Sequence, residues 1–405
     1  MKHRAEIDGL RALAVVPVIL FHAGFELFSG GFVGVDVFFV ISGYLITTII
    51  IEDIENKRFS IVHFYERRAR RILPALFFVM MICVPFAWTL LSAASLNKFG
   101  NGLIGVSVFL SNVVFWRQQG YFAESAELNP ILHTWSLAVE EQYYVLFPLF
   151  LVLAWRFGKS RVFWMIVVMA SISLLLSEWG WRNKETANFY LAPTRAWELF
   201  AGSIAAFIVQ KQEVQKNNFL ALLGFATIIF SILVYDENTP SPSVYTLMPV
   251  LGAVLLVLYA EKETLVAKFL STKVFVSLGL VSYSAYLWHQ PVFAFFRIYT
   301  NQISLHWLLA LVLIIITFLL SYVSWRFVEV PFRNRNLINK YLLFALSSIA
   351  LMSLLAIGYA SKQGTIGLEF KLAKQLSEND FVYFENLNER RFLEGRLLYP
   401  MKPVD

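Results

Sequence analysis

The sequence predicts an all-α fold, a polytopic bundle of transmembrane helices. Of its 405 residues, 58% are hydrophobic and 15% are charged, whereas soluble domains have about 45–50% apolar and about 25% charged residues. Apolar runs of about 17–25 residues, the length that a helix needs to cross the hydrocarbon core, recur along most of the chain. The net charge of +6 comes from basic residues in short loops between these runs, which indicates membrane orientation rather than nucleic-acid binding.

About eleven of these runs are predicted to cross the membrane. They are 10–28, 33–51, 72–92, 137–155, 162–178, 195–210, 218–235, 244–260, 275–296, 304–325 and 340–360. If the run 100–116 crossed as well, the later basic loops would lie outside, against the preference of Lys and Arg for the cytoplasmic side. We therefore expect 100–116 to form a re-entrant or interfacial helix on the outer side, with the N-terminus in the cytoplasm and the C-terminal tail outside.

The start of the chain and its single cysteine add two expectations. The charged start, without a small-residue cleavage site behind the first apolar run, predicts that this run stays in the protein. Cys83 lies within an apolar run, so neither a disulfide framework nor a thiolate metal cluster is expected, and no metal site is predicted.

Ionisable residues inside the predicted spans are the best guide to function, because each costs roughly 2.5–3.5 kcal/mol to insert. Arg11 and His22 both lie in the first span, eleven residues apart. This spacing is within about 20° of three full helical turns and about 16 Å along the axis. One helix face therefore carries Arg11 near the cytoplasmic surface and His22 in the outer half. The alternative is that Arg11 extends to the interface and His22 is a structural histidine.

The second span contains Asp36, Ser42 and Tyr44 among large apolar residues. Asp36 is a candidate to orient a histidine or to bind a basic partner. The glycines of this span, among them Gly31 and Gly43, indicate close helix packing.

Four arginines end the loop 52–71 at the cytoplasmic mouth of the third span. They are Arg67, Arg68, Arg70 and Arg71. Membrane orientation explains one or two of them. Because the planar guanidinium suits bidentate phosphate contacts, the cluster predicts a site for a cytosolic phosphorylated ligand.

Further polar residues lie around the later spans. The spacing of His133 and Glu140 puts both on one face of the fourth span if both are helical. Such a pair is a candidate for acid–base chemistry, with interfacial anchoring as the alternative. Arg195 and Glu198, three residues apart, predict a salt bridge within the sixth span. In the ninth span, Pro291 is expected to kink the helix beside a polar stretch.

An ordered set of segments carries a resemblance to a known family. The segments are EIDGLRALAVVPVILFHAG, GGFVGVDVFFVISGYLIT, YERRARRILPA, LHTWSLAVEEQYY, RAWELFAGS, YSAYLWHQPV and VEVPFR. In this order they resemble the membrane-bound acyltransferase-3 family, the O-acetyltransferases of bacterial surface polysaccharides. The resemblance covers about residues 4–335. It implies that acetyl is taken from cytosolic acetyl-CoA and delivered, at the bacterial inner membrane, to a hydroxyl of an outer glycan such as lipopolysaccharide O-antigen.

The resemblance also implies roles for individual residues. The family's arginine–ten residues–histidine motif falls on Arg11 and His22, and its arginine–two residues–arginine motif falls on Arg68 and Arg71, with Arg67 and Arg70 as the alternative register. We expect the arginines and Arg11 to bind acyl-CoA and His22 to act as a base or to be acylated, with Asp36 or Glu140 orienting its ring. The expected substrate pathway is lined by Ser42, Tyr44, His133, Trp135, Tyr286 and His289.

The expected domains are 1–335, the acyltransferase membrane domain, 336–360, a further transmembrane helix, and 361–405, an outer tail. Relatives of this type often continue into an SGNH-type hydrolase-like domain. The tail is therefore expected to be the start of such a domain or to meet a separate SGNH-type chain, with the alternative that the membrane domain suffices by itself. Two alternatives from other classes stay open. One is a secondary transporter or glycan flippase, because polar groups in a bundle also describe a translocation pathway. The other is a regulatory membrane subunit.

Overall fold

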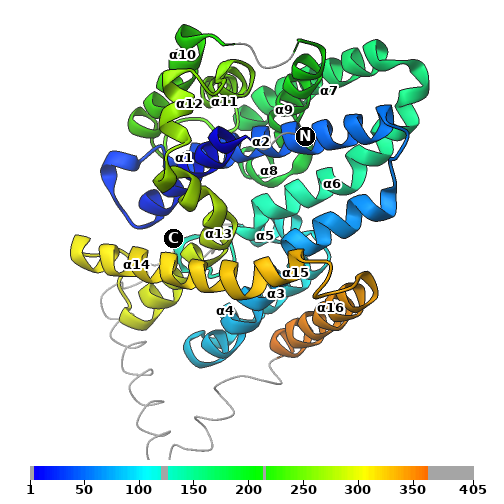
Figure 1. Ribbon diagram of the computed structural model, residues 1–405. Coiled ribbons are helices and arrows are strands. Elements are labelled where there is room, and N and C mark those ends of the chain that lie inside the picture. The colour runs from blue at the N-terminus through cyan, green and yellow to red at the C-terminus, as the bar shows by residue number, and fades with distance from the viewer. Residues whose placement is uncertain (1–3, 120–125, 213–215, 364–405) are drawn as a thin grey trace, which may run out of the picture.

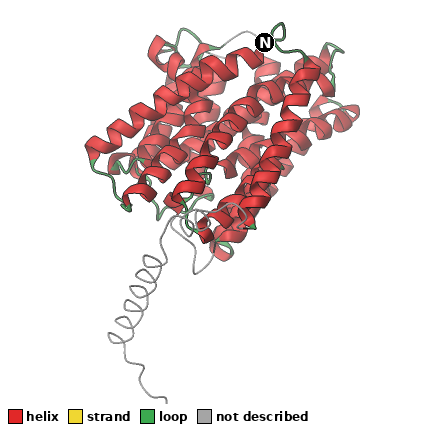
Figure 2. Ribbon diagram, turned by 90° about the horizontal axis from the view of Figure 1, so that it is seen from below, coloured by secondary structure: helices red, strands yellow, loops and turns green. Residues whose placement is uncertain are grey.

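The computed structural model describes residues 4–119, 126–212 and 216–363, and within these ranges the regular elements are helices, without a strand (Figures 1 and 2). The predicted all-α fold is confirmed. The expected outer tail falls almost entirely on residues 364–405, which lie outside the described residues.

Sixteen α-helices follow one another in the described parts of the chain. They are α1 (Ala5–His22), α2 (Gly34–Glu55), α3 (Ile61–Leu90), α4 (Ala93–Ser107), α5 (Ser111–Gln118), α6 (Thr134–Ala154), α7 (Lys159–Asn183), α8 (Glu185–Tyr190), α9 (Ala192–Gln212), α10 (Asn218–Val234), α11 (Leu247–Tyr259), α12 (Leu265–Leu270), α13 (Lys273–Thr300), α14 (Trp307–Ser324), α15 (Val330–Arg333) and α16 (Lys340–Lys362). Short 3₁₀ segments join several of them, and a π-helical segment, Trp325–Glu329, links α14 to α15.

Six helical segments are long and apolar enough to cross a membrane by length and composition. They are Gly31–Glu55, Ile61–Leu90, Thr134–Phe157, Lys159–Asn183, Trp307–Arg333 and Lys340–Lys362. The chain is therefore a multi-pass membrane protein. Each of the other five predicted crossings also coincides with a helix, α1, α9, α10, α11 or α13. That these five cross stays a prediction.

The run 100–116 does not form the single helix that the sequence suggested. It is divided between α4 and α5. The break is at Phe109, whose φ is 56°, and the amides of Phe109 and Leu110 donate to the carbonyls of Val106 and Gly105. This is the left-handed turn that commonly closes a helix. α4 then packs against α16, while α5 packs against α6 and α8.

Close glycine contacts bring pairs of helices together. A Cβ atom at Gly43 of α2 would overlap the carbonyl of Leu199 in α9, and one at Gly202 of α9 would overlap the carbonyl of Val40 in α2. A Cβ at Gly279 of α13 would likewise overlap the Asp8 carbonyl of α1. The interpretation of the second-span glycines Gly31, Gly34 and Gly43 as close-packing residues is confirmed, since Cβ atoms at Gly31 and Gly34 would overlap backbone carbonyls of α1.

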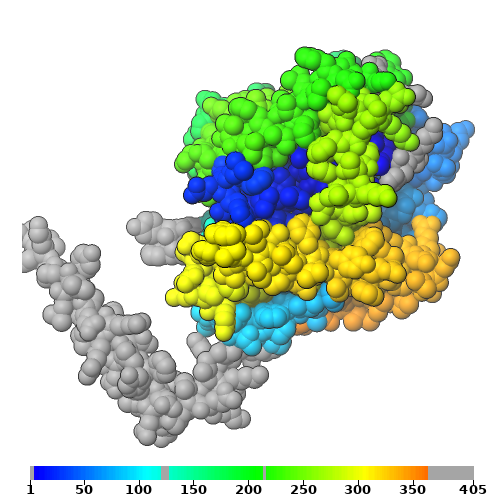
Figure 3. Space-filling model, turned by 60° about the vertical axis from the view of Figure 1, so that its left-hand side comes forward, coloured from blue at the N-terminus to red at the C-terminus, as the bar shows by residue number. Residues whose placement is uncertain are grey.

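The charged first helix is covered by its neighbours. α1 contacts α2, α12 and α13, and Figure 3 shows the blue N-terminal segments between the green α10–α12 and the yellow α14. Its acidic residues Glu6 and Asp8 are 4% and 7% exposed. The polar groups of α1 therefore face protein, which is how membrane proteins accommodate them.

We predict that Gly202→Ala destabilises the protein, because the new methyl group has no room against the α2 backbone. The expected loss is about 1–3 kcal/mol, seen as a lower midpoint of thermal unfolding in detergent. Ala226→Val on the exposed face of α10 adds bulk without a contact and serves as the control. Equal midpoints for both variants would contradict the α2–α9 contact.

Candidate functional site

Two cavities lie along α1, one beside Arg11 in the middle of the helix and one at its C-terminal end, and they share no lining residue. The first, of about 90 Å³, contains Arg11, and we call it the arginine cavity. Its polar lining includes Arg11, Ser42, Arg68, Arg71, Glu140 and Tyr286. α1, α2, α3, α6 and α13 thus each contribute a polar side chain, all five in segments that the sequence singled out.

The structure separates the four clustered arginines into two pairs. Arg68 and Arg71 line the arginine cavity. Arg67 instead pairs with Asp53 at 2.9 Å, and its side chain is 36% exposed. Arg70 pairs with Glu66 at 2.9 Å and donates to two carbonyls of the chain around α15. Residues three apart share a helix face whereas neighbours do not, so the register Arg68 and Arg71 faces the cavity, contrary to the expectation for Arg67 and Arg70.

The arginine cavity carries positive charge that is only partly compensated. Arg68 lies over the rings of Phe64 and Tyr144, each 5.9 Å from the guanidinium carbon. Its buried Nε has no hydrogen-bond partner among the described residues. Arg11 pairs with Asp8 of its own helix at 3.2 Å. A buried donor without a partner costs about 1–3 kcal/mol, so this cavity is suited to an anionic ligand.

Glu140 belongs to a hydrogen-bonded group at the wall of this cavity. The Ser42 hydroxyl donates to Glu140, and the Tyr144 hydroxyl donates to Ser42 Oγ at 3.0 Å. The carboxylate is therefore fixed between α2 and α6. Contrary to the expectation that it orients His22, Glu140 lines the cavity that contains Arg11 and not the one that contains His22.

The second cavity, of about 480 Å³, contains His22, and we call it the His22 pocket. Its polar lining includes His22, Glu26, Glu127, Asp236, Asn238 and Gln290. The pKa of Asp236 is lowered because the Thr239 hydroxyl and the Asn238 amide donate hydrogen bonds to its carboxylate. Asp236 is therefore an anion at neutral pH, and the pocket offers several hydrogen-bond acceptors.

His22 ends α1 with a defined tautomer. Its Nδ1 lies 2.8 Å from the Val18 carbonyl oxygen. Because a carbonyl can only accept, Nδ1 carries the hydrogen and Nε2 carries the lone pair. The His22 carbonyl in turn accepts a hydrogen bond from Arg297 Nη2 at 2.8 Å. The ring is thus arranged as a base whose acceptor nitrogen is Nε2.

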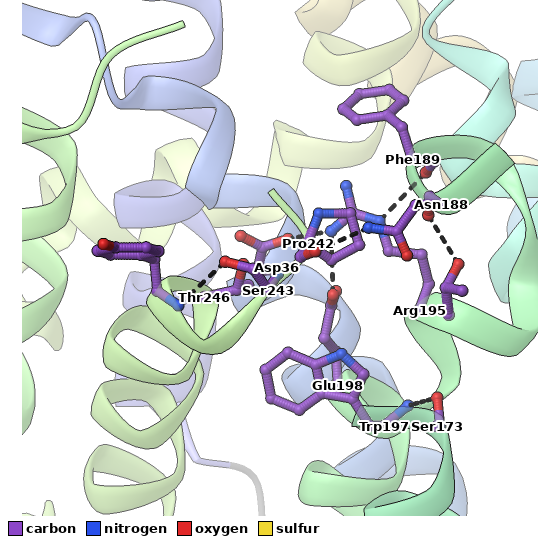
Figure 4. Close-up of polar contacts among 12 residues, drawn as sticks. Asp36, Ser173, Asn188, Phe189, Arg195, Trp197, Glu198, Pro242, Ser243 and Thr246 are labelled. Carbon is purple, nitrogen blue, oxygen red and sulfur yellow. Dashed lines mark hydrogen bonds and ion pairs between the residues drawn. The ribbon is translucent and has the colours of Figure 1, made fainter. Parts of the chain in front are cut away.

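Asp36 is bound to an arginine and not to a histidine (Figure 4). Arg195 Nη1 lies 2.8 Å from Asp36 Oδ1 and 3.0 Å from Glu198 Oε1. The guanidinium carbon of Arg195 also lies about 5 Å from the ring centres of Trp135 and Phe189. The predicted Arg195–Glu198 salt bridge is confirmed. The expectation that Asp36 orients His22 is replaced by the second of the two roles considered, which is binding a basic partner.

Four of the six expected pathway residues, Tyr44, His133, Trp135 and His289, line neither of these cavities within the described parts of the chain, and two of the four have packing contacts instead. The Tyr44 hydroxyl accepts a hydrogen bond from Arg4 Nη1 at 3.0 Å, and Trp135 packs against Arg195. Both side chains support the packing of α2 and α6. Helical spacing alone did not reveal this, since it gives the face of a residue but not the neighbour on that face.

Three further pathway residues, His133, Tyr286 and His289, lie close together and connect His22 with the arginine cavity. The ring centres of His22 and His289 are 5.1 Å apart, and those of His289 and His133 are 5.4 Å apart. The Tyr286 ring lies 5.5 Å from His133, and its hydroxyl lies 2.6 Å from Ser136 Oγ. Among the described residues no group of three or more His, Cys, Asp or Glu side chains is arranged to hold a metal ion.

Several residues of the site were not predicted from the sequence. Tyr144 could have been found, because it lies one helical turn after Glu140. Glu26, Glu127 and Asp236 come from three connections far apart in the chain, and no spacing rule joins them. Gln290 directly follows His289, but no sequence pattern marked it as a residue of the site.

Comparisons with known proteins agree with the segments quoted above. The acyltransferase domain family matches residues 4–326. The O-acetyltransferase OatA of Staphylococcus aureus strain NCTC 8325 is 32% identical over 347 residues, 82% of this chain and 57% of OatA, and strain COL gives the same values. A protein of strain MSSA476, named as a suspected O-acetyltransferase, is 28% identical over 354 residues, 83% of this chain and 58% of that protein. The chain thus spans less than two thirds of these relatives. No solved structure matches it.

We predict that Arg195→Ala destabilises the protein, because Asp36 and Glu198 then lose their buried counter-charge. Breaking a buried ion pair costs about 3–5 kcal/mol, measured as a lower thermal midpoint in detergent. Arg67→Ala removes a half-exposed ion pair and should change stability by less than about 1 kcal/mol. Similar midpoints of thermal unfolding for the two variants would show that the Arg195 contacts do not stabilise the fold.

Proposed function

Since the chain belongs to the acyltransferase-3 family, we propose that it is a membrane O-acyltransferase that moves acetyl from acetyl-CoA to a hydroxyl of a cell-surface glycan. The observation that carries this proposal is the pair of cavities joined by α1. One presents guanidinium groups, and the other presents a base among hydrogen-bond acceptors. A donor with phosphates and an acceptor with hydroxyls need these two chemistries.

The arginine cavity suits the donor. Arg68 and Arg71 bind the phosphates of acetyl-CoA at the mouth of α3, and Arg11 adds a third positive charge on the way towards His22. The unpartnered Nε of Arg68 supports this assignment, since a phosphate oxygen would supply the missing acceptor. The cavity as it stands is narrow, so the donor widens it on entry.

The His22 pocket suits the acceptor. His22 Nε2 takes the proton of an acceptor hydroxyl, whose oxygen attacks the thioester carbonyl. The carbon–sulfur bond then breaks, and the thiolate leaves with the electron pair and is protonated to coenzyme A. In a second route Nε2 itself attacks the carbonyl, and the acyl-imidazole passes the acyl group to the hydroxyl.

The acceptor is proposed to be neutral in the part that enters this pocket. The carboxylates of Glu26, Glu127 and Asp236 accept hydrogen bonds from sugar hydroxyls but repel phosphate or carboxylate groups. Surface polysaccharides, for example lipopolysaccharide O-antigen, supply such hydroxyls. The relatives named O-acetyltransferase support the transfer of acetyl to oxygen.

The proposed location is the bacterial inner membrane, with the Arg11 end of α1 and the N-terminus in the cytoplasm. The donor then enters from the cytosol, and the acceptor reaches His22 from the outer side. The C-terminal tail is proposed to lie outside, where it would meet an SGNH-type domain or chain. Basic residues at the Arg11 end agree with the orientation preference of membrane proteins.

We predict that His22→Ala lowers the transfer of acetyl to glycan by at least about 10²-fold, because the base is lost. The measurement is the O-acetyl content of glycan in cells, together with release of coenzyme A from labelled acetyl-CoA by purified protein. Donor binding should persist. Unchanged O-acetylation would remove His22 from the mechanism, and wild-type protein that neither releases coenzyme A nor becomes labelled would favour a transporter.

We also predict that Arg68→Gln and Arg71→Gln each weaken acetyl-CoA binding by about tenfold or more, since each removes a charge-assisted hydrogen bond worth about 1.5–3 kcal/mol. Binding is measured by titration of the purified protein in detergent. Arg67→Gln, next to Arg68 in α3 but paired with Asp53 outside the cavity lining, is the matched control and should bind normally. Equal losses in all three variants would contradict the assigned register.

A further inference from the structure

We propose that a groove between α7 and α9 binds an anionic phospholipid of the surrounding membrane. The two helices pack side by side (Figure 1), and α7 is one of the segments that can cross a membrane. The groove has a volume of about 520 Å³, within the range of about 300–1,000 Å³ that is usual for ligand pockets. Its described lining residues belong to neither the arginine cavity nor the His22 pocket. The proposal is therefore independent of acyl transfer.

One half of the groove is polar and carries positive charge. Lys159 and Ser160 begin α7, and Lys211 and Gln212 end α9. The ammonium group of Lys159 lies 2.6 Å from Glu55 Oε1, in an ion pair whose side chains are both more than a third exposed. Such a pair contributes little to stability and leaves two N–H groups of Lys159 for another acceptor. Lys211 has no ion pair among the described residues, so the groove contains a positive charge without a counter-charge.

The other half of the groove is apolar and opens towards the membrane. The rings of Phe163 and Phe207 lie against each other, with their centres 6.0 Å apart. Trp164, which also lines the groove, is 61% exposed. It begins a row of apolar side chains on one face of α7, each more than half exposed, which consists of Trp164, Val168, Ile172 and Leu175. Around a membrane-crossing helix such a row faces lipid chains, so the open side of the groove meets hydrocarbon.

The two halves together fit a ligand that has a charged head and a hydrocarbon tail. A phosphate in the polar half accepts hydrogen bonds from Lys211 and Lys159, and an acyl chain extends along Trp164. An inorganic anion would leave the aromatic half of the groove without a partner. A phospholipid with a choline or ethanolamine head brings a cation of its own, which the lysines repel. Basic pockets between membrane helices bind anionic head groups for the same reason.

General features of membrane proteins account for parts of this groove but not for their combination. The preference of lysine for cytoplasmic loops explains Lys159 and Lys211, and the preference of tryptophan for the interface explains Trp164. Both preferences act on each residue separately, and neither requires a shared groove. A binding site, in contrast, requires that Lys211 and Trp164, from different helices, contact the same lipid molecule. Only a binding site therefore makes the lipid beside Trp164 depend on the charge of Lys211.

The test measures which lipid lies beside Trp164. The whole chain is placed in phosphatidylcholine vesicles that contain a small fraction of brominated phosphatidylglycerol or of brominated phosphatidylcholine, because bromine quenches the fluorescence of a tryptophan that it contacts. The chain has 11 tryptophans, so the difference from a Trp164→Phe variant gives the signal of Trp164. We expect phosphatidylglycerol to be preferred beside Trp164 by at least about fivefold at low salt, since each lysine favours an anionic head group by about this factor.

Substitutions of single lysines show whether the groove is responsible. Lys211→Gln should reduce the preference about fivefold, whereas Lys273→Gln, at the exposed start of α13, is the matched control and should leave it unchanged. Equal quenching of Trp164 by the two brominated lipids in the unsubstituted protein overturns the site. A preference that falls no more in Lys211→Gln than in Lys273→Gln also overturns it, because the groove lysine would then have no special part. The vesicles contain no acetyl-CoA, so these outcomes do not depend on the proposed function.

Discussion

The contact between α2 and α9 holds the rest of the structure in place. Glycines at Gly43 and Gly202 let the two backbones meet, and Arg195 joins Asp36 to Glu198 across the same interface. Buried charges are tolerated only when they are compensated inside the protein, so this ion group fixes the rotation of α2. That rotation determines that Ser42 faces Glu140 in the arginine cavity while Tyr44 faces Arg4. Trp135 of α6 completes the group through its contact with Arg195.

The two cavities of the site differ in charge because of where basic and acidic residues stand in the sequence. At one end, Arg68 and Arg71 lie one turn apart on α3, and Arg11 faces them from α1. At the other end, acidic side chains from separate connections surround His22. In a medium of low dielectric constant such differences act over longer distances than in water. The bundle therefore presents opposite electrostatic environments to ligands that approach from its two ends.

Helical periodicity made part of this predictable from the sequence. It gave the existence and approximate bounds of the long helices and the salt bridge from Arg195 to Glu198, while the pairing of Arg68 with Arg71 came from the resemblance to a family motif. It could not show that Asp36 contacts Arg195, because the two residues are 159 positions apart. Asp36 of the second span and Glu140 of the fourth span also looked equally suited to orient His22. Nor could it show the turn at Phe109, since the apolar run continues through it, or the assembly of the His22 pocket from loops.

The separation of the two cavities also affects whether ions can leak through the bundle. No residue lines both of them, and the buried rings of His133 and His289 lie between. A continuous aqueous path between the cavities would let ions cross the membrane down the membrane potential. Each elementary charge that crossed would release about 2.3 kcal/mol per 100 mV. A wall of aromatic and imidazole rings excludes hydrated ions while leaving the reacting groups within one helix length of each other. For the transfer proposed above, such a bundle would bring together reagents from two compartments and still insulate one compartment from the other.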